Sequence, residues 1–466
     1  MSIPGLGQIP EQPTTTTSTR TISLRPGCEY RFAAPLSSSS PLTIRLLHGT
    51  AEKDGTELAP GHTYIFTALR ARILTWQGCE LEVSGRTERE DIRNYNSPGE
   101  NPRSSWLNLH AKLQELRETA GRERREGPRV LIAGGKGVGK TMMARTLTAY
   151  ATRRGEQPLV VNTDPEDGML TLPGSLSAAV FATIMDVEAA DGWGTTPASG
   201  PSAVPVKLPL AYSLGRRRWK ADVGKEEWKA EGSADADGLC KELVSRLAGK
   251  VSKRLSEDEA VKRAGVVVDT AASDAEKDAE MLGHIVDEFS VNIVVVLGTP
   301  SLANTLTERF AREKTSIGEP IQVIPLDALD RDSSGMGDEE TWPQHTRERA
   351  IKEYFFGGGR RTLSPQIQQV DFDAIVIYRY ADTPDSPLVR MEPSSELEHW
   401  TLAVMYASTR DPADAVRAAS VMGYVYVSEV DEEKRKVRML APVGGRLGDR
   451  PLVVGTWPEP FISLLG

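Results

Sequence analysis

The segment that most constrains the fold is Gly134-Gly-Lys-Gly-Val-Gly139-Lys140-Thr141, which matches the pattern GxxxxGK[ST] without a mismatch. The apolar run VLIA at 130–133 precedes it, and a helical pattern at 141–152 follows it. A strand that leads through a glycine-rich turn into a helix directs backbone N–H groups and the positive end of the helix dipole at one point, which is how phosphate is bound. The segment therefore predicts a P-loop inside an α/β domain.

Each residue type in this loop has an expected role. The glycines allow the backbone to curl so that successive N–H groups point inward. Lys140 would bridge the β- and γ-phosphates of a nucleotide, and the Thr141 hydroxyl would hold Mg²⁺. The residues expected to bind the nucleotide are Gly134, Gly137, Val138, Gly139, Lys140, Thr141 and Met142.

Two aspartates are candidates for the carboxylate that a P-loop magnesium site needs. Asp164 follows the apolar run LVV at 159–161, and Asp269 follows the run VVV at 266–268. The second run is the better match to four apolar residues followed by Asp, but either side chain could be a turn former. The pattern alone leaves both open.

The rest of the chain divides by its periodicity. Residues 1–20 are rich in Thr, Ser and Pro and are expected to form a disordered arm. Short β-favouring runs separated by turn signals predict an N-terminal β-sandwich over 21–103. Alternating strand and helix patterns predict a doubly wound sheet in a central P-loop domain over 104–357, and a smaller β-rich domain is expected over 358–466.

Composition restricts the classes of function. The 466 residues carry a net charge of -9, so any RNA contact would be local, for example at Arg216-Arg-Arg-Trp-Lys220. The three cysteines, Cys28, Cys79 and Cys240, are far apart and predict free thiols. No apolar run reaches the roughly 18 residues of a membrane span and the start has no apolar leader, so an intracellular protein without membrane partners is expected.

Several stretches together resemble the polynucleotide 5'-hydroxyl kinase family, and within it the P-loop subunit of the mRNA cleavage and polyadenylation factor of the fungal cleavage factor IA type. The resemblance covers nearly the whole chain, and its most specific part is the N-terminal segment GTAEKDGTEL. It is carried by His48-Gly-Thr-Ala-Glu52, Gly55-Thr-Glu-Leu58, Gly78-Cys79, Leu81-Glu-Val-Ser-Gly85-Arg86-Thr87-Glu88, Gly127-Pro-Arg-Val130, Thr171-Leu-Pro-Gly174, Pro209-Leu-Ala-Tyr212 and Ile351-Lys-Glu-Tyr-Phe-Phe-Gly357.

The resemblance implies ATP and Mg²⁺ as cofactors and gives roles to further residues. It favours Asp164 over Asp269 as the group that serves the metal and the attacking hydroxyl. Glu29 looks like the residue that reaches adenine, with Arg70 as a weaker candidate on a nearby strand. Arg347 and Lys352 would be the basic residues of a lid that acts in catalysis.

The same resemblance shows two departures. Active kinases of the family have a Gln where this chain has Asp167, and a Thr-x-Gly-Trp motif where it has Thr270-Ala-Ala-Ser273. Phosphoryl transfer depends on positioning and charge, so both changes could remove activity while nucleotide binding survives. Little or no turnover is therefore expected.

The first hypothesis is thus an ATP-binding structural subunit required for pre-mRNA 3'-end cleavage and polyadenylation in the nucleus. Its implied partners are the scaffold subunit that also binds the RNA polymerase II tail and other cleavage and polyadenylation subunits. The alternative is an active ATP-dependent RNA 5'-hydroxyl kinase, supported by Lys140, Thr141 and Asp164. The third hypothesis is a P-loop ATPase or GTPase unrelated to RNA, and the N-terminal resemblance disfavours it.

Overall fold

The computed structural model describes residues 19–35, 41–166, 169–189, 192–193, 209–214, 233–273, 276–329, 341–358, 361–380, 388–442, 444, 447–455 and 464. Residues 1–18 of the expected arm, Asp167 and the basic segment 216–220 lie outside these ranges. The chain forms two compact units. The first contains the residues up to Lys53 together with Glu57–Pro98, and the second contains Asp54–Thr56 and Gly99–Gly466.

The first unit is built on two antiparallel β-sheets. One has the strand order β1 (Thr19–Leu24), β8 (Cys79–Ser84), β3 (Leu42–Gly49) and β6 (Thr63–Phe66). The other has the order β5 (Thr56–Glu57), β4 (Glu52–Lys53), β7 (Arg70–Leu74), β2 (Glu29–Ala33) and β9 (Arg89–Arg93). Phe32 of β2 and Phe66 of β6 are fully buried with ring centroids 5.3 Å apart, so the two sheets pack face to face as the predicted sandwich.

The second unit contains the predicted P-loop sheet. Its strand order is β13 (Leu210–Ser213), β12 (Ser175–Val180), β11 (Leu159–Asn162), β14 (Val266–Asp269), β10 (Arg129–Gly134), β15 (Ile293–Leu297) and β16 (Gln322–Leu326). The five strands β11, β14, β10, β15 and β16 are parallel to one another. The sheet therefore presents the carboxyl ends of these five strands at one edge, where α/β proteins bind ligands.

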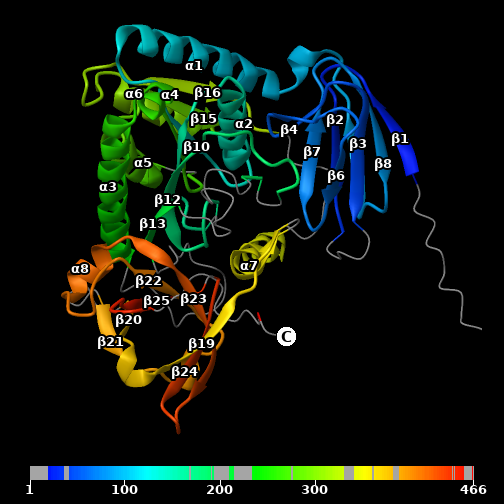
Figure 1. Cartoon of the computed structure of the whole chain (residues 1–466). Coiled ribbons are helices and arrows are strands. Elements are labelled where there is room, and N and C mark those ends of the chain that lie inside the picture. The colour runs from blue at the N-terminus through cyan, green and yellow to red at the C-terminus, as the bar shows by residue number, and fades with distance from the viewer. Residues whose placement is uncertain are drawn as a thin grey trace, which may run out of the picture. The chain divides into compact units, whose positions relative to one another are not determined.

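Helices cover both faces of this sheet (Figure 1). The alternation of side chains along β10 shows how: Val130 and Ile132 share one core with α1 (Arg103–Glu123) and α2 (Lys140–Arg153). Leu131 and Ala133 share the other core with α3 (Ser233–Glu257), α4 (Glu259–Ala264), α5 (Glu276–Glu288) and α6 (Pro300–Phe310). Strands buried on both faces explain the continuous apolar runs in the sequence.

One feature of this domain was not predicted. Strand β12 runs antiparallel to both β11 and β13, so the sheet is mixed at that edge and not parallel throughout. Helix α1 extends to Glu123 and so includes the charged residues Arg122 and Glu123. Helix α1 then ends at Arg124, which adopts a left-handed conformation with φ 54°.

A second seven-stranded sheet forms the β-rich C-terminal part and curls round on itself (Figure 1). Its order is β19 (Gln366–Asp371), β24 (Lys436–Ala441), β23 (Val421–Asp431), β22 (Thr401–Met405), β25 (Leu452–Val454), β20 (Ile377–Tyr380) and β21 (Leu388–Met391). Helix α7 (Thr341–Phe356) leads to it through the short pair β17 (Gly357–Gly358) and β18 (Arg361–Thr362), and α8 (Ala413–Ala418) contacts β21. Among the described residues, no helix is both long and apolar enough to span a bilayer.

Candidate nucleotide-binding site

The P-loop joins β10 to α2 and has the backbone that its glycines predict. Gly134, Gly137 and Gly139 have φ values of 144°, 75° and 100°, in the region that residues with a side chain rarely adopt. A Cβ atom on Gly134 would lie 2.5 Å from the Leu297 carbonyl oxygen of β15. Only glycine therefore fits where the loop leaves the sheet.

Two side chains of α2 lie inside the loop. The Lys140 ammonium donates a hydrogen bond to the Gly135 carbonyl oxygen at 2.9 Å, and Lys140 is buried. The Thr141 hydroxyl donates to Asp269 Oδ2 at 2.6 Å. The cation, the hydroxyl and a carboxylate thus converge at the carboxyl edge of the sheet, as a site for Mg²⁺ and phosphate requires.

Asp269 is the residue whose role the sequence left open and the resemblance set aside. It ends β14 next to the P-loop strand, where Ile132 pairs with it, and only 1% of it is exposed. Its place against Thr141 follows from the register of two neighbouring parallel strands. The run of apolar residues ending in Asp was the signal that pointed to it.

Asp164 lies one strand further along the same edge. Asn162 of β11 pairs with Asp269 of β14, so Asp164 comes two residues after the point level with Asp269. It is half-buried, and its Oδ1 accepts a hydrogen bond from the Glu166 N–H at 2.9 Å. The Asp164 carboxylate is thus held in a local turn of the type that Asp favours.

The loop that departs from the kinase motif packs against the P-loop. The Thr270 hydroxyl donates to the Ile132 carbonyl oxygen at 2.8 Å, and the Ser273 N–H donates to the Gly134 carbonyl oxygen at 3.0 Å. Residues 270–273 supply small side chains at this point and no aromatic ring. This loop supports the P-loop but offers no flat surface for a base.

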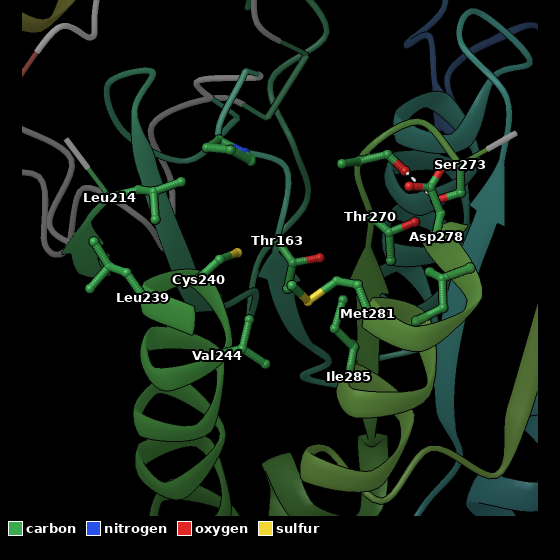
Figure 2. Close-up of a pocket in the computed structure, with 13 residues that line it drawn as sticks. Thr163, Leu214, Leu239, Cys240, Val244, Thr270, Ser273, Asp278, Met281 and Ile285 are labelled. Atoms are coloured by element: carbon green, nitrogen blue, oxygen red, sulfur yellow. Dashed lines mark hydrogen bonds between the residues drawn. The ribbon is translucent and has the colours of Figure 1, made fainter. Parts of the chain in front are cut away.

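A small cavity of about 40 Å³ lies beside this loop (Figure 2). Thr163, Thr270 and Ser273 line it from the sheet edge, Leu239, Cys240 and Val244 from α3, and Asp278, Met281 and Ile285 from α5. An apolar ring such as benzene needs a cavity of about 150 Å³, whereas a water needs roughly 10–15 Å³. The cavity has room for water or one small apolar group and is too small for a nucleobase.

The candidates from the N-terminal sequence lie in the first unit. Glu29 begins β2, is 1% exposed and accepts a hydrogen bond at Oε2 from Arg31 Nε at 3.2 Å. Arg70 lies on the neighbouring strand, as expected, but pairs with Ala33 at the other end of β2. Four strand residues, about 13 Å, therefore separate the backbone of Arg70 from the level of Glu29.

The lid candidates lie on α7. Arg347 is half-buried and Lys352 is exposed. Five residues along a helix correspond to about 140° of rotation, so the two side chains leave α7 in different directions. The C-terminal half of α7 is fixed by buried Ile351 and Phe355, and by the Tyr354 hydroxyl, which accepts the Tyr424 N–H at 2.9 Å.

Behind the P-loop, α1 supports α2. The ring of His110 lies 5.1 Å from the ring of Tyr150, and burial lowers the pKa of His110 to about 4, with the charges of Arg117 and Arg154 acting in the same direction. Burial also lowers the pKa of Arg117 to about 10, opposed by Glu156. Arg117 donates from Nε to the Ala264 carbonyl oxygen at 2.8 Å, which ties α1 to the end of α4.

All three cysteines are free, as predicted. Cys28 and Cys79 are buried, and Cys240 is half-buried at the cavity.

Three family profiles match successive parts of the chain. They are described as the N-terminal beta-sandwich domain of polyadenylation factor at residues 23–120, the mRNA cleavage and polyadenylation factor CLP1 P-loop at 134–194 and 232–357, and the pre-mRNA cleavage complex II protein Clp1 at 363–459. Together they span both units.

Curated relatives and solved structures agree with these profiles. The mRNA cleavage and polyadenylation factor CLP1 of Pyricularia oryzae is 47% identical and that of Chaetomium globosum 46%, each over 100% of both chains. The structure of a wild-type Clp1p–Pcf11p complex matches with a TM-score of 0.80 and 27% identity, over 94% of this chain and 98% of that chain. The chain belongs to the CLP1 family of mRNA cleavage and polyadenylation factors.

Proposed function

We propose that this protein is an ATP- and Mg²⁺-holding structural subunit of the nuclear machinery that cleaves and polyadenylates pre-mRNA. The observation that carries the proposal is the 2.6 Å hydrogen bond from Thr141 to Asp269 in an intact P-loop. Next to it, residues 270–273 provide no platform for an acceptor base. A relative's structure is described as explaining ATP loss in a glycine-to-arginine point mutant, so ATP is the nucleotide associated with this fold.

The residues present fit Mg²⁺-ATP. The P-loop amides from Gly134 to Met142 and the Lys140 ammonium would hold the phosphates. Thr141, Asp269 and Asp164 offer hydroxyl and carboxylate oxygens, the ligands that Mg²⁺ prefers. The bound metal would neutralise the phosphate charge.

Glu29 remains the proposed acceptor for the amino group of adenine. Its carboxylate lies against the Arg31 guanidinium, and a carboxylate oxygen can accept a hydrogen bond from an amino group. Arg70, at the other end of the strand pair, is the weaker proposal for the base.

Slow or absent phosphoryl transfer is the second part of the proposal. A neutral Gln and an aromatic residue are replaced by Asp167 and by the small residues 270–273. A base stacked on an aromatic side chain gains roughly 1–3 kcal/mol, which this chain lacks there. Arg347 and Lys352 are the proposed lid residues, but the Lys352 ammonium cannot make the bidentate contact to phosphate that an Arg makes.

A partner is proposed from the solved relatives, which are complexes of Clp1p with Pcf11p. This chain would bind the corresponding scaffold subunit of its own cleavage factor. Loss of nucleotide is expected to weaken that assembly. The measurement is co-precipitation of the scaffold subunit by nucleotide-loaded wild-type protein and by the Lys140→Ala variant.

The deciding experiment for activity has two steps on the same purified protein. Nucleotide is first extracted and identified, and the protein is then incubated with γ-labelled ATP and 5'-hydroxyl RNA. Bound ATP without RNA labelling supports the structural role. Labelling that is lost in Lys140→Ala would establish the kinase instead, and an empty site with no ATP binding by calorimetry would contradict both.

A further inference from the structure

Two loops that follow the neighbouring strands β15 and β16 contact the P-loop. Thr299 follows β15, and its Oγ1 accepts a hydrogen bond from the Gly135 N–H at 3.3 Å. Leu329 follows β16, and its N–H donates to the Val138 carbonyl oxygen at 3.3 Å. The family resemblance assigned no role to either residue, and neither lies in a recognised motif.

The Gly135 peptide is held from both sides. Its N–H is bonded to Thr299, while its carbonyl oxygen accepts the Lys140 ammonium at 2.9 Å. A phosphate in the loop would draw the ammonium toward itself and weaken the second bond. The Thr299 hydroxyl would then be the side-chain contact that keeps this buried peptide in place.

Leu329 supports the other end of the loop through its side chain. It is 6% exposed and belongs to the same core as Val138 and Trp106. A Cβ atom on Gly139 would lie 3.0 Å from Leu329 Cδ1, so the side chain fills the space directly against the last glycine. Shortening it would leave a void where α2 begins.

We propose that Thr299 and Leu329 are positioning residues that hold the P-loop in its phosphate-binding shape before the nucleotide arrives. A loop that is already ordered loses less conformational entropy when it binds, so its affinity is higher. The inference rests on the proposed function only in taking Mg²⁺-ATP as the ligand. The order of the nucleotide-free loop can be measured without it.

The test uses the full chain freed of nucleotide and compares Thr299→Val with Thr299→Ser. Valine keeps the shape but removes the acceptor, whereas serine keeps the hydroxyl. Loss of one hydrogen bond of about 1 kcal/mol corresponds to roughly five-fold weaker binding, so Thr299→Val should bind Mg²⁺-ATP about five-fold more weakly by calorimetry. The Gly135 amide should also exchange hydrogen faster in the nucleotide-free protein.

Leu329→Ala, with Leu329→Met as its matched control, tests the second contact. Alanine should weaken ATP binding and speed amide exchange over 134–141, and methionine should restore both. Should Leu329→Ala fail to fold, Leu329→Met and the Thr299 pair still decide the matter.

The outcomes separate this inference from the proposed function. Wild-type protein that binds no ATP contradicts the proposed function, and faster exchange in Thr299→Val alone would still support the positioning role. Equal exchange and equal ATP affinity in Thr299→Val and wild type would overturn it. Equal losses in Thr299→Ser and Thr299→Val would also overturn it, because the hydroxyl would then not be the group responsible.

Discussion

The carboxyl edge of the P-loop sheet has two halves, one at β10 and β15 and one at β11 and β14, and they differ in which functional side chains are present. Around β10 and β15, the P-loop glycines, Lys140 and Thr141 have the backbone and contacts that phosphate binding needs. Around β11 and β14, Asp164 and Asp269 remain, but residues 270–273 carry only small side chains. The first half has the groups that a P-loop uses to bind phosphate, whereas residues 270–273 on the second half include no aromatic side chain.

This difference follows from what each task requires of the sequence. Phosphate is held mainly by backbone N–H groups, so glycines and one lysine suffice. An acceptor must be aligned by particular side chains, and each of these can be lost without disturbing the loop. The Ser273 N–H still bonds the Gly134 carbonyl oxygen, so the altered loop keeps its supporting contact.

The largest effect is expected for Lys140→Ala. Removing the buried cation should abolish ATP co-purification. A ligand held at about 100 times its dissociation constant contributes roughly 2.7 kcal/mol to the free energy of unfolding, which this variant should lose. The measurements are nucleotide extraction and thermal unfolding with and without ATP.

Ser273→Ala is the control on the acceptor half. It removes a hydroxyl that donates to the Ala271 carbonyl oxygen but keeps the N–H on Gly134. ATP content should therefore stay at the wild-type level. If Lys140→Ala melts like the wild type in the presence of ATP, the proposal that the P-loop half binds the nucleotide through Lys140 is contradicted.

Gly134→Ala should come next in size. Its Cβ would meet the Leu297 carbonyl oxygen at 2.5 Å, so the loop must leave its place on β15. ATP affinity measured by calorimetry should then fall by roughly 100-fold, or about 2.8 kcal/mol. Gly137→Ala is the matched control, because nothing lies within 4 Å of its Cβ. That variant bears only the left-handed backbone cost of about 1–2 kcal/mol, roughly ten-fold in affinity. Equal losses of ATP affinity in the two variants would show that backbone strain, and not the clash with Leu297, weakens binding.

Asp269→Asn compared with Asp164→Asn tests which aspartate serves the metal. A hydrogen bond to a charged group contributes about 1.5–3 kcal/mol, so Asp269→Asn should lower the Mg²⁺-dependent part of ATP affinity roughly ten-fold or more. Asp164→Asn should change binding much less. Titrations with Mg²⁺ and with EDTA measure this part of the affinity in both variants. A larger loss in Asp164→Asn than in Asp269→Asn would favour Asp164 as the metal ligand, as the family resemblance implies.

The sequence predicted the P-loop and the class of each part because those signals are local. GxxxxGK[ST] and the runs at 130–133, 159–161 and 266–268 fix strand, turn and helix within a few residues. The choice between Asp164 and Asp269 required the strand order, which places β14 beside β10 and β11 one strand further away. Strand order is set by packing between distant segments, so no local pattern contains it.

The other features that the sequence did not predict also depend on packing between distant segments. Strand β12 and its partner β13 lie 30 residues apart in sequence and pair only through tertiary structure. Leu329 packs against Gly139 from a loop after the last strand of the sheet. Arg70 does lie on the strand next to Glu29, yet the antiparallel register puts it at the far end.

The smallest expected effect concerns the support behind the phosphate-holding half. Three groups surround His110: Arg117 on its own helix, Tyr150 on α2 and Arg154 after α2. Its folded pKa of about 4 lies below the ordinary value of 6.5, so the unfolded chain binds more protons between these values. The contribution of neutral His110 to stability is complete above pH 6.5 and is lost as the pH falls toward 4.

His110→Leu should therefore reduce the loss of stability between pH 6.5 and 4 in the nucleotide-free protein, as measured by urea unfolding at several pH values. Leucine keeps an apolar contact for the Tyr150 ring and cannot take up a proton. Because α1 and α2 pack together behind the P-loop, the same variant should also preserve ATP binding at pH 5 better than wild type. An identical pH profile in both proteins would show that protonation of His110 is not what lowers the stability between pH 6.5 and 4.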